Sequence, residues 1–141
     1  MMTFPEHMEN QSIPRTLYHG TNLKWWHMRN ETNPRHYTNP NRGIVILTSD
    51  LRLAFDVATN RAASFKSKPI VLVIDSEVAL EGGSNISLSS RNVASPDVEF
   101  DTDSIPKNAI THVYDMSGVR QSQLLFPEDS DRLPELGRLI E

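Results

Sequence analysis

The sequence predicts one small α+β domain, in which several short strands pack with one well-defined helix. Its 141 residues are about the length of a single domain and supply enough chain for one hydrophobic core. Short apolar runs rich in β-branched side chains indicate strands, and a longer stretch with a 3.6-residue apolar period indicates a helix. There is no internal repeat, so one domain accounts for the whole pattern.

The first elements follow from proline, glycine and aromatic positions. Residues 1–14 are polar, contain two prolines and show no period, which predicts a poorly ordered arm before a domain at 15–141. Residues 15–18 are expected to form a short strand that His19, Gly20 and Thr21 end. Residues 22–42 are expected to be a long loop with one helical turn that includes Leu23, Trp25 and Trp26.

The strongest pattern is a strand, a helix cap and a helix in succession. Residues 44–47 form a β-branched run, and Thr48, Ser49 and Asp50 are residues that favour a helix start. The helical period then places apolar side chains at Leu51, Ala54, Phe55, Ala58, Ala62 and Phe65. Residues 70–74 predict a second, central strand.

The second half of the chain has weaker patterns. Residues 82–96 carry serines without periodicity and predict a second long loop. Further strands are expected around residues 98–100, 109–114 and 124–126, with a turn at 105–106. A short helix after Asp131 would have Pro134 in its first turn.

Composition excludes several classes of protein. The chain contains no cysteine, which rules out disulfides, thiolate catalysis and cysteine-ligated zinc. It has no apolar stretch long enough for a membrane helix and no basic or apolar N-terminal signal, so a cytoplasmic protein without a membrane partner is expected. A net charge of -4 argues against broad, sequence-independent binding to nucleic acid.

His19 is the first candidate for chemistry. At a strand end, its imidazole could point into a cleft and bond a hydroxyl while the backbone of Gly20 meets a planar amide. The alternative is a histidine that only ends a strand. Thr48 and Ser49 offer hydroxyls at the end of another strand, although both are also explained by the helix that follows.

A group of alternating carboxylates is the second candidate. In an extended strand Asp97, Glu99, Asp101 and Asp103 would share one face. Like charges at this spacing repel one another unless they meet a cation. Glu99 therefore fits a role in stabilising a cationic transition state; a calcium site and a solvated edge strand remain alternatives.

Other catalytic patterns are absent from the sequence. Its five histidines lack the i, i+4 spacing of a metal-binding helix, so no metal is expected. The chain also lacks the Gly-x-Ser-x-Gly elbow of serine hydrolases and the glycine motifs of phosphate and dinucleotide loops.

Four segments together resemble the ADP-ribosyltransferase superfamily. They are Tyr18-His-Gly-Thr21, Ile44-Val-Ile-Leu-Thr-Ser-Asp50 with Ala54 and Ala58, Val71-Leu-Val-Ile-Asp75, and Asp97-Val-Glu99 with Ile105, Pro106 and Ile110. Their order is similar to the diphtheria-toxin-like, His-Tyr-Glu branch, which includes the poly-ADP-ribose polymerases and the small rifamycin-modifying transferases. The resemblance spans residues 16–115 and implies two small mixed or antiparallel sheets around a cleft that binds NAD.

The resemblance also implies roles for individual residues. His19 would bond the adenosine ribose and act with Glu99 in catalysis, and the Gly20 backbone would hold the nicotinamide amide, with Thr21 beside it. Glu99 would bond the nicotinamide ribose and stabilise the oxocarbenium-like state as nicotinamide leaves. Thr48 and Ser49 would shape the floor beneath that ribose.

The sequence departs from the branch at the residue that stacks on nicotinamide. The family usually has a tyrosine where this chain has Ile46, and Tyr37 or Trp26 would have to supply the ring instead. Asp97 stands where arginine-modifying relatives position their acceptor.

The expected function is transfer of ADP-ribose from NAD to a macromolecule, most simply a protein side chain, by a small toxin or effector. A nucleic-acid base or a small molecule is the next candidate for the acceptor. Two alternatives remain, an inactive module of the same fold that binds a partner protein, and an RNA 2′-phosphotransferase.

Overall fold

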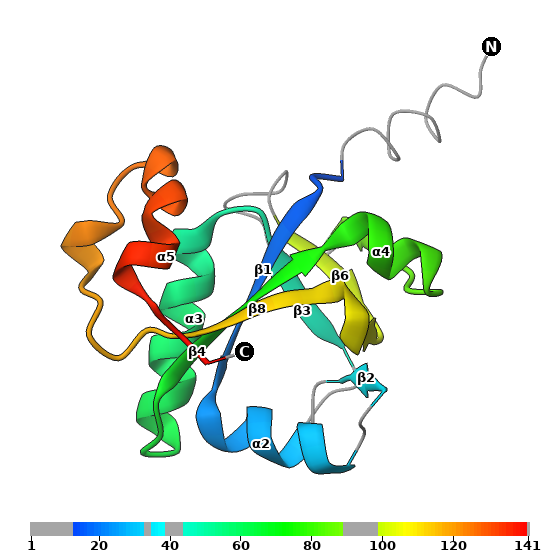
Figure 1. The fold of residues 1–141 in the computed structure, drawn as a ribbon, viewed down its shortest axis with the longest axis horizontal. Helices are drawn as coiled ribbons and strands as arrows, with labels where there is room; N and C mark the ends of the chain where they lie inside the picture. Colours follow the sequence, from blue (N-terminus) through cyan, green and yellow to red (C-terminus); the bar gives the residue numbers. More distant parts are fainter. Residues whose placement is uncertain (1–12, 33–34, 39–43, 89–98, 141) are drawn as a thin grey trace.

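The computed structural model describes residues 13–32, 35–38, 44–88 and 99–140, and Figure 1 shows their arrangement. The predicted N-terminal arm lies largely outside these residues. Within them, Ile13 packs against the core, and the Pro14 carbonyl accepts a hydrogen bond from Ser76 Oγ at 2.7 Å. The described chain therefore joins the domain from Ile13 onward.

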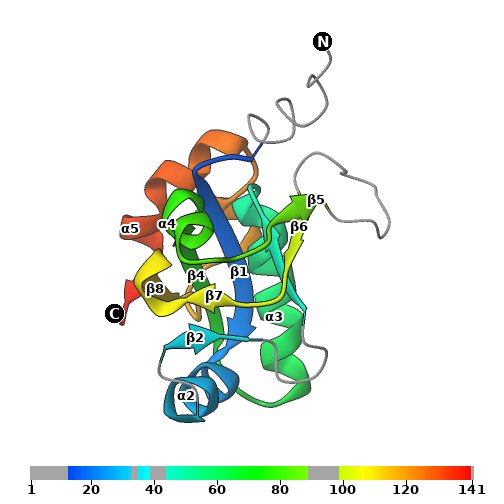
Figure 2. The same cartoon turned by 90° about the vertical axis from the view of Figure 1, so that its right-hand side faces the viewer.

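Seven strands form one sheet in the order β5-β6-β3-β1-β4-β8-β9. Every pair of neighbouring strands in the described residues is antiparallel. The seven strands are β1 (Thr16–Asn22), β3 (Val45–Thr48), β4 (Pro69–Asp75), β5 (Ser87–Leu88), β6 (Glu99–Thr102), β8 (Ile110–Asp115) and β9 (Arg138–Leu139). A second sheet pairs β2 (His36–Tyr37) with β7 (Ile105–Pro106), as Figure 2 shows.

The described part of the chain has four α-helices beside the sheets: α2 (Leu23–Thr32), α3 (Leu51–Ser64), α4 (Ser76–Glu81) and α5 (Leu133–Leu136). Three short 3₁₀ helices join them, namely η1 (Lys107–Ala109), η2 (Gln121–Gln123) and η3 (Pro127–Arg132). The fold is therefore a small α+β domain with an antiparallel main sheet, which confirms the predicted class. None of the helices in the described ranges has the length and apolar content to span a lipid bilayer.

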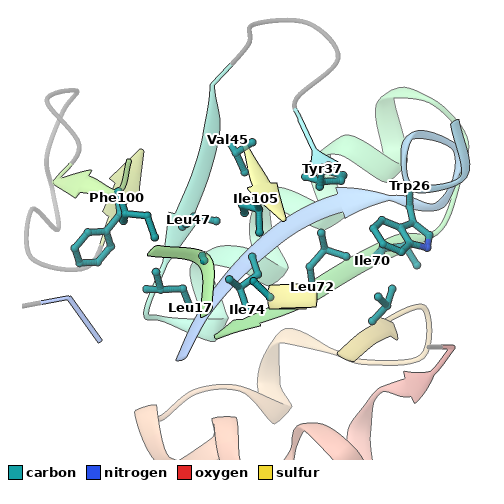
Figure 3. Packing of buried hydrophobic residues seen from close by; sticks show 14 residues of the cluster. Leu17, Trp26, Tyr37, Val45, Leu47, Ile70, Leu72, Ile74, Phe100 and Ile105 are labelled. Carbon is teal, nitrogen blue, oxygen red and sulfur yellow. The ribbon is translucent and has the colours of Figure 1, made fainter. Parts of the chain in front are cut away.

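The main sheet separates two apolar clusters. On one face, Ile70, Leu72 and Ile74 of β4 join side chains from β1, β3, α2 and the small sheet, which Figure 3 shows packed together. On the other face, Val71 of β4 packs with the apolar side of α3. This alternation is what a strand buried on both faces requires, so the prediction of a central strand at residues 70–74 is confirmed.

Helix α3 begins as the sequence predicts. Asp50 is its N-cap, and the Asp50 carboxylate accepts a hydrogen bond from the Arg52 backbone N–H at 2.9 Å. The buried side of the helix consists of Leu51, Ala54, Phe55, Ala58 and Ala62, as the period indicates. Phe65 lies beyond the helix and is exposed.

The first strand and the helix after it are longer than expected. The strand does not end at His19, because β1 pairs with β4 over all seven residues from Thr16 to Asn22. Helix α2 follows at once and has ten residues rather than one turn. Asn22 Oδ1 accepts a hydrogen bond from the Trp25 backbone N–H at 2.8 Å, which satisfies one of the unpaired donors at the helix start.

The expected strand at residues 124–126 is wrong. Its backbone groups bond to side chains and to adjoining turns instead of a neighbouring strand. The Leu125 carbonyl accepts from Arg52 Nη1 at 2.9 Å, Phe126 N–H donates to Asp129 at 3.0 Å, and Leu124 N–H donates to the Gln121 carbonyl at 3.0 Å. The last strand is β9, after α5, whose first turn contains Pro134 as predicted. The sequence analysis also missed α4 within the stretch after β4.

Candidate functional site

A cavity opens where β1 and β3 diverge. The two strands pair at a single position in the described residues, Tyr18 opposite Thr48, whereas β1 stays paired with β4 along its whole length. Beyond that position a cavity of about 250 Å³ lies beside α3, and we call it the β1–β3 cavity. It is lined by Tyr18 and Gly20 of β1, Ile46 and Thr48 of β3, Leu53, Ala54, Val57 and Arg61 of α3, and Glu99 of β6.

Glu99 enters the cavity from the neighbouring strand. It is the first residue of β6 and lies opposite Thr48 in the register of β3 and β6. Its side chain is half-buried, and the next residue, Phe100, points into the core on the other face. Asp101 shares the face of Glu99, as the alternation predicts, while Asp97 lies outside the described residues.

Gly20 is required by the close approach of α3. A Cβ atom at this position would lie 2.1 Å from the Ala54 carbonyl oxygen and 2.7 Å from the Ala58 nitrogen. Both are backbone atoms of α3, so they cannot move aside as the tip of a side chain could. Glycine therefore has a packing role here, whether or not a ligand binds.

His19 does not point into the cavity, so the expectation that its imidazole faces a cleft is wrong. The ring is 1% exposed and lies in the core. Its Nδ1 lies 2.7 Å from the Ile46 carbonyl oxygen, and its Nε2 lies 3.1 Å from the Tyr37 hydroxyl. Because a carbonyl only accepts, Nδ1 carries the proton and Nε2 accepts from Tyr37.

The environment of His19 keeps it neutral. Burial lowers the pKa of the imidazole to about 3, with help from the positive charge of Arg61 and against the hydrogen bond to Ile46. The physical consequence is a side-chain link between β1 and β3. It joins the two strands where the backbone pairing of Tyr18 and Thr48 is not continued.

The other residues expected around the nucleotide divide between the core and the cavity. Thr21, Trp26 and Tyr37 are buried in the core and do not line the cavity. The Tyr37 and His19 rings meet edge to face with centroids 5.2 Å apart, and burial raises the pKa of the Tyr37 phenol. Neither Tyr37 nor Trp26 supplies a ring to the β1–β3 cavity in this structure.

Thr48 and Ser49 are adjacent in sequence but line different cavities. Thr48 lines the β1–β3 cavity, and its Oγ1 also accepts a hydrogen bond from the Asp50 backbone N–H at 3.0 Å. Ser49 lines a second cavity of about 240 Å³, which lies between the start of α3 and the segment around Phe126. The hydroxyl of Thr48 therefore serves the helix start, as the alternative interpretation predicts.

The sequence analysis assigned no role to two polar side chains that line the cavity, Tyr18 and Arg61. Tyr18 is the aromatic side chain of the cavity, and strand alternation could have revealed it because it lies two residues before Gly20. Arg61 lies near the end of α3, and its Nη1 donates to the Gly20 carbonyl at 2.9 Å. No local pattern links Arg61 to Gly20, because the contact depends on how α3 crosses β1.

The described residues contain no group of three histidine, aspartate or glutamate side chains that could hold a metal ion. Comparison with protein-family models gives no match, and no curated protein matches the sequence. The fold and the geometry of the cavity are therefore the observations on which a function can be argued.

Proposed function

We propose that the protein is an NAD-dependent ADP-ribosyltransferase whose reaction takes place in the β1–β3 cavity. One observation carries this proposal: Glu99 lines the same cavity as Gly20 and Ile46, although the three residues come from separate segments of the chain. These are the positions at which the resemblance places the catalytic carboxylate, the amide-binding backbone and the stacking residue.

The chemistry needs a fixed negative charge, and Glu99 is the acidic side chain among the cavity residues. The bond between the nicotinamide nitrogen and ribose C1′ breaks, and neutral nicotinamide leaves with the bonding electrons. Positive charge then develops on the ribose, where a carboxylate stabilises the transition state. The acceptor forms the new bond to C1′ and gives up a proton.

The size of the cavity limits which part of the dinucleotide it holds. Ligand pockets typically measure about 300–1,000 Å³, so a cavity of about 250 Å³ suits one end of NAD rather than the whole molecule. In this proposal the nicotinamide and its ribose occupy the cavity beside Tyr18 and Ile46. The adenosine end extends beyond the cavity.

His19 has a different role from the one that the resemblance implies. Its buried ring contacts the Ile46 carbonyl and Tyr37, which makes it a positioning residue that holds β3 against β1. Tyr18 replaces Tyr37 and Trp26 as the aromatic side chain that faces the substrate. A protein side chain is the proposed acceptor.

The test is the release of nicotinamide from NAD by the wild-type protein and by Glu99→Gln. Removing one group that stabilises transition-state charge typically slows catalysis by about 10²–10³-fold. We expect at least this loss for Glu99→Gln, with an unchanged melting temperature. Asp101→Asn is the matched control, since Asp101 follows on the same face of β6, and its release rate should stay within a few-fold of wild type.

Undiminished release in Glu99→Gln would remove Glu99 from the mechanism. Mass spectrometry of a lysate treated with NAD and the protein should then show ADP-ribose on a macromolecule if the transfer itself is correct. The modified residue would identify the acceptor class.

The second candidate is an inactive module of the same fold that binds a partner protein. It is favoured by the burial of His19 and by Ile46 at the position of the usual stacking tyrosine. Calorimetry with NAD separates the two functions, because neither binding nor nicotinamide release is expected of the module. An RNA 2′-phosphotransferase has less support, since Arg61 is the one basic side chain among the cavity residues.

A further inference from the structure

Arg61 projects from α3 into the β1–β3 cavity and is held there by contacts on two elements. Its Nη1 donates to the Gly20 carbonyl of β1 at 2.9 Å. Its guanidinium carbon lies 5.6 Å from the centre of the Trp25 ring, which belongs to α2. A cation over an indole face is stabilised by the ring electrons, so both contacts restrain the side chain at the cavity wall.

The cavity has one charge of each sign among its lining residues. Arg61 is the cation and Glu99 is the anion, and the other lining residues are apolar or neutral. This pattern fits a ligand that has an anionic group at one end and a developing positive charge at the other.

We propose that Arg61 is the anion-binding residue of the cavity and that it recognises a phosphate of the substrate. This inference rests on the proposed function, because it names which end of a dinucleotide faces each wall. The ribose that gains positive charge lies by Glu99, and the phosphate next to it lies by Arg61. Arg61 then makes the protein specific for phosphate-bearing nicotinamide compounds.

Guanidinium chemistry supports this assignment. A guanidinium carries five N–H donors in a planar fork, so it can serve a backbone oxygen and a phosphate together. Two parallel N–H···O bonds to a phosphate are stronger than bonds between neutral groups and fix the orientation of the ligand. Because Gly20 and Trp25 already hold the side chain, less conformational freedom is lost when the anion binds.

The experiment compares three ligands by calorimetry with the full chain: NAD, ADP-ribose and nicotinamide riboside, which has no phosphate. We expect Arg61→Gln to lower the affinity for NAD and for ADP-ribose about tenfold or more. Its affinity for nicotinamide riboside should stay within about twofold of wild type. Arg61→Lys keeps the positive charge but loses the planar pair of N–H donors. Its affinity for NAD and ADP-ribose should therefore lie between those of the wild type and Arg61→Gln.

Arg52→Gln is the matched control on the same helix. Arg52 pairs with Asp50 at 2.9 Å and contributes to the second cavity, so this variant should bind all three ligands as the wild type does. Thermal unfolding of each variant shows whether it is folded at the temperature of the titration.

Two results would overturn the inference: an equal loss of affinity for all three ligands in Arg61→Gln, or no loss for any. If either occurs while the wild type still releases nicotinamide, the inference fails and the proposed function stands. If ADP-ribose binds and depends on Arg61 but NAD is never cleaved, the transferase proposal fails and the anion site stands.

Discussion

The two faces of β1 show how one strand serves two purposes. Leu17, His19 and Thr21 point to one side and are almost completely buried in the cluster that contains Tyr37. Tyr18 and Gly20 point to the other side, toward α3 and the β1–β3 cavity. The strand has a two-residue period, so each face could acquire its own character without altering the other.

The shape of the cavity depends on contacts at both faces of β1. On the core face of β1, the His19 side chain bonds the Ile46 backbone and ties β3 to β1. On the α3 face, which is also buried, Gly20 lets α3 lie directly against the strand. The cavity exists between these two restraints, so disturbing either face should have a distinct and measurable effect.

The largest effect is expected on the α3 face of β1, from Gly20→Ala. The new Cβ would overlap two backbone atoms of α3, and the helix must move away from β1 to relieve the clash. Overpacking of this kind typically costs about 1–3 kcal/mol and occasionally more, and we expect about 3 kcal/mol here because no flexible side chain can yield. Urea unfolding followed by circular dichroism measures the loss.

Gly118→Ala is the control for that variant. A Cβ at Gly118 meets no atom within 4 Å, so its stability should change by less than about 1 kcal/mol. Equal behaviour of the two alanine variants would mean that α3 does not press on Gly20.

Burial of His19 on the core face of β1 should make the free energy of unfolding depend on pH. In the folded chain the pKa of His19 is about 3, whereas an unfolded histidine titrates near 6.5. Between these values the unfolded state binds the extra proton, so stability should fall by up to about 1.4 kcal/mol for each pH unit as pH decreases from 6.5 toward 3. The stability that the neutral, buried His19 contributes is fully present above pH 6.5 and is lost progressively as the pH falls below that value.

The measurement is urea unfolding at several pH values for the wild type, His19→Gln and His112→Gln. His19→Gln should lower stability at neutral pH and remove about one proton from the pH dependence below 6.5. His112 is exposed, so His112→Gln is the control for the loss of an imidazole outside the core. An unchanged slope in His19→Gln would show that another group causes the acid sensitivity.

A smaller effect is expected where α3 begins, from Asp50→Ala. This change removes the N-cap hydrogen bond to the Arg52 backbone and the partner of the Arg52 guanidinium. Loss of an N-cap costs about 1 kcal/mol, and the exposed ion pair adds little. Asp50→Asn keeps the capping oxygen and loses the charge. Its melting temperature in thermal unfolding should therefore be close to that of the wild type.

Much of the fold could be predicted because the patterns were local. The apolar period and the Asp50 cap identified α3, and the β-branched run identified β4. The prediction at residues 124–126 failed because an apolar run does not reveal that Arg52 and Asp129 will take its backbone hydrogen bonds. Helix α2 was underestimated because tertiary packing of its tryptophans supports a weak helical pattern.

The candidate site was predicted in part. The sequence pointed to Gly20, Thr48 and Glu99, and the structure brings these three to one cavity. It could not show that His19 faces the core, since strand alternation does not tell which face meets the core and which meets α3. Arg61 was missed for a similar reason, because its contact with Gly20 joins residues far apart in the chain.

The class of the fold, the start of α3, the central strand and the common face of Glu99 and Asp101 follow from the sequence alone. These features follow from backbone geometry and from the spacing of apolar side chains, which act over a few residues. Which face of β1 meets the core and which meets α3, where β1 and β3 part, and which side chains share the cavity follow from the tertiary structure alone. Those outcomes depend on packing between distant segments, where the closeness of α3 to Gly20 sets the geometry.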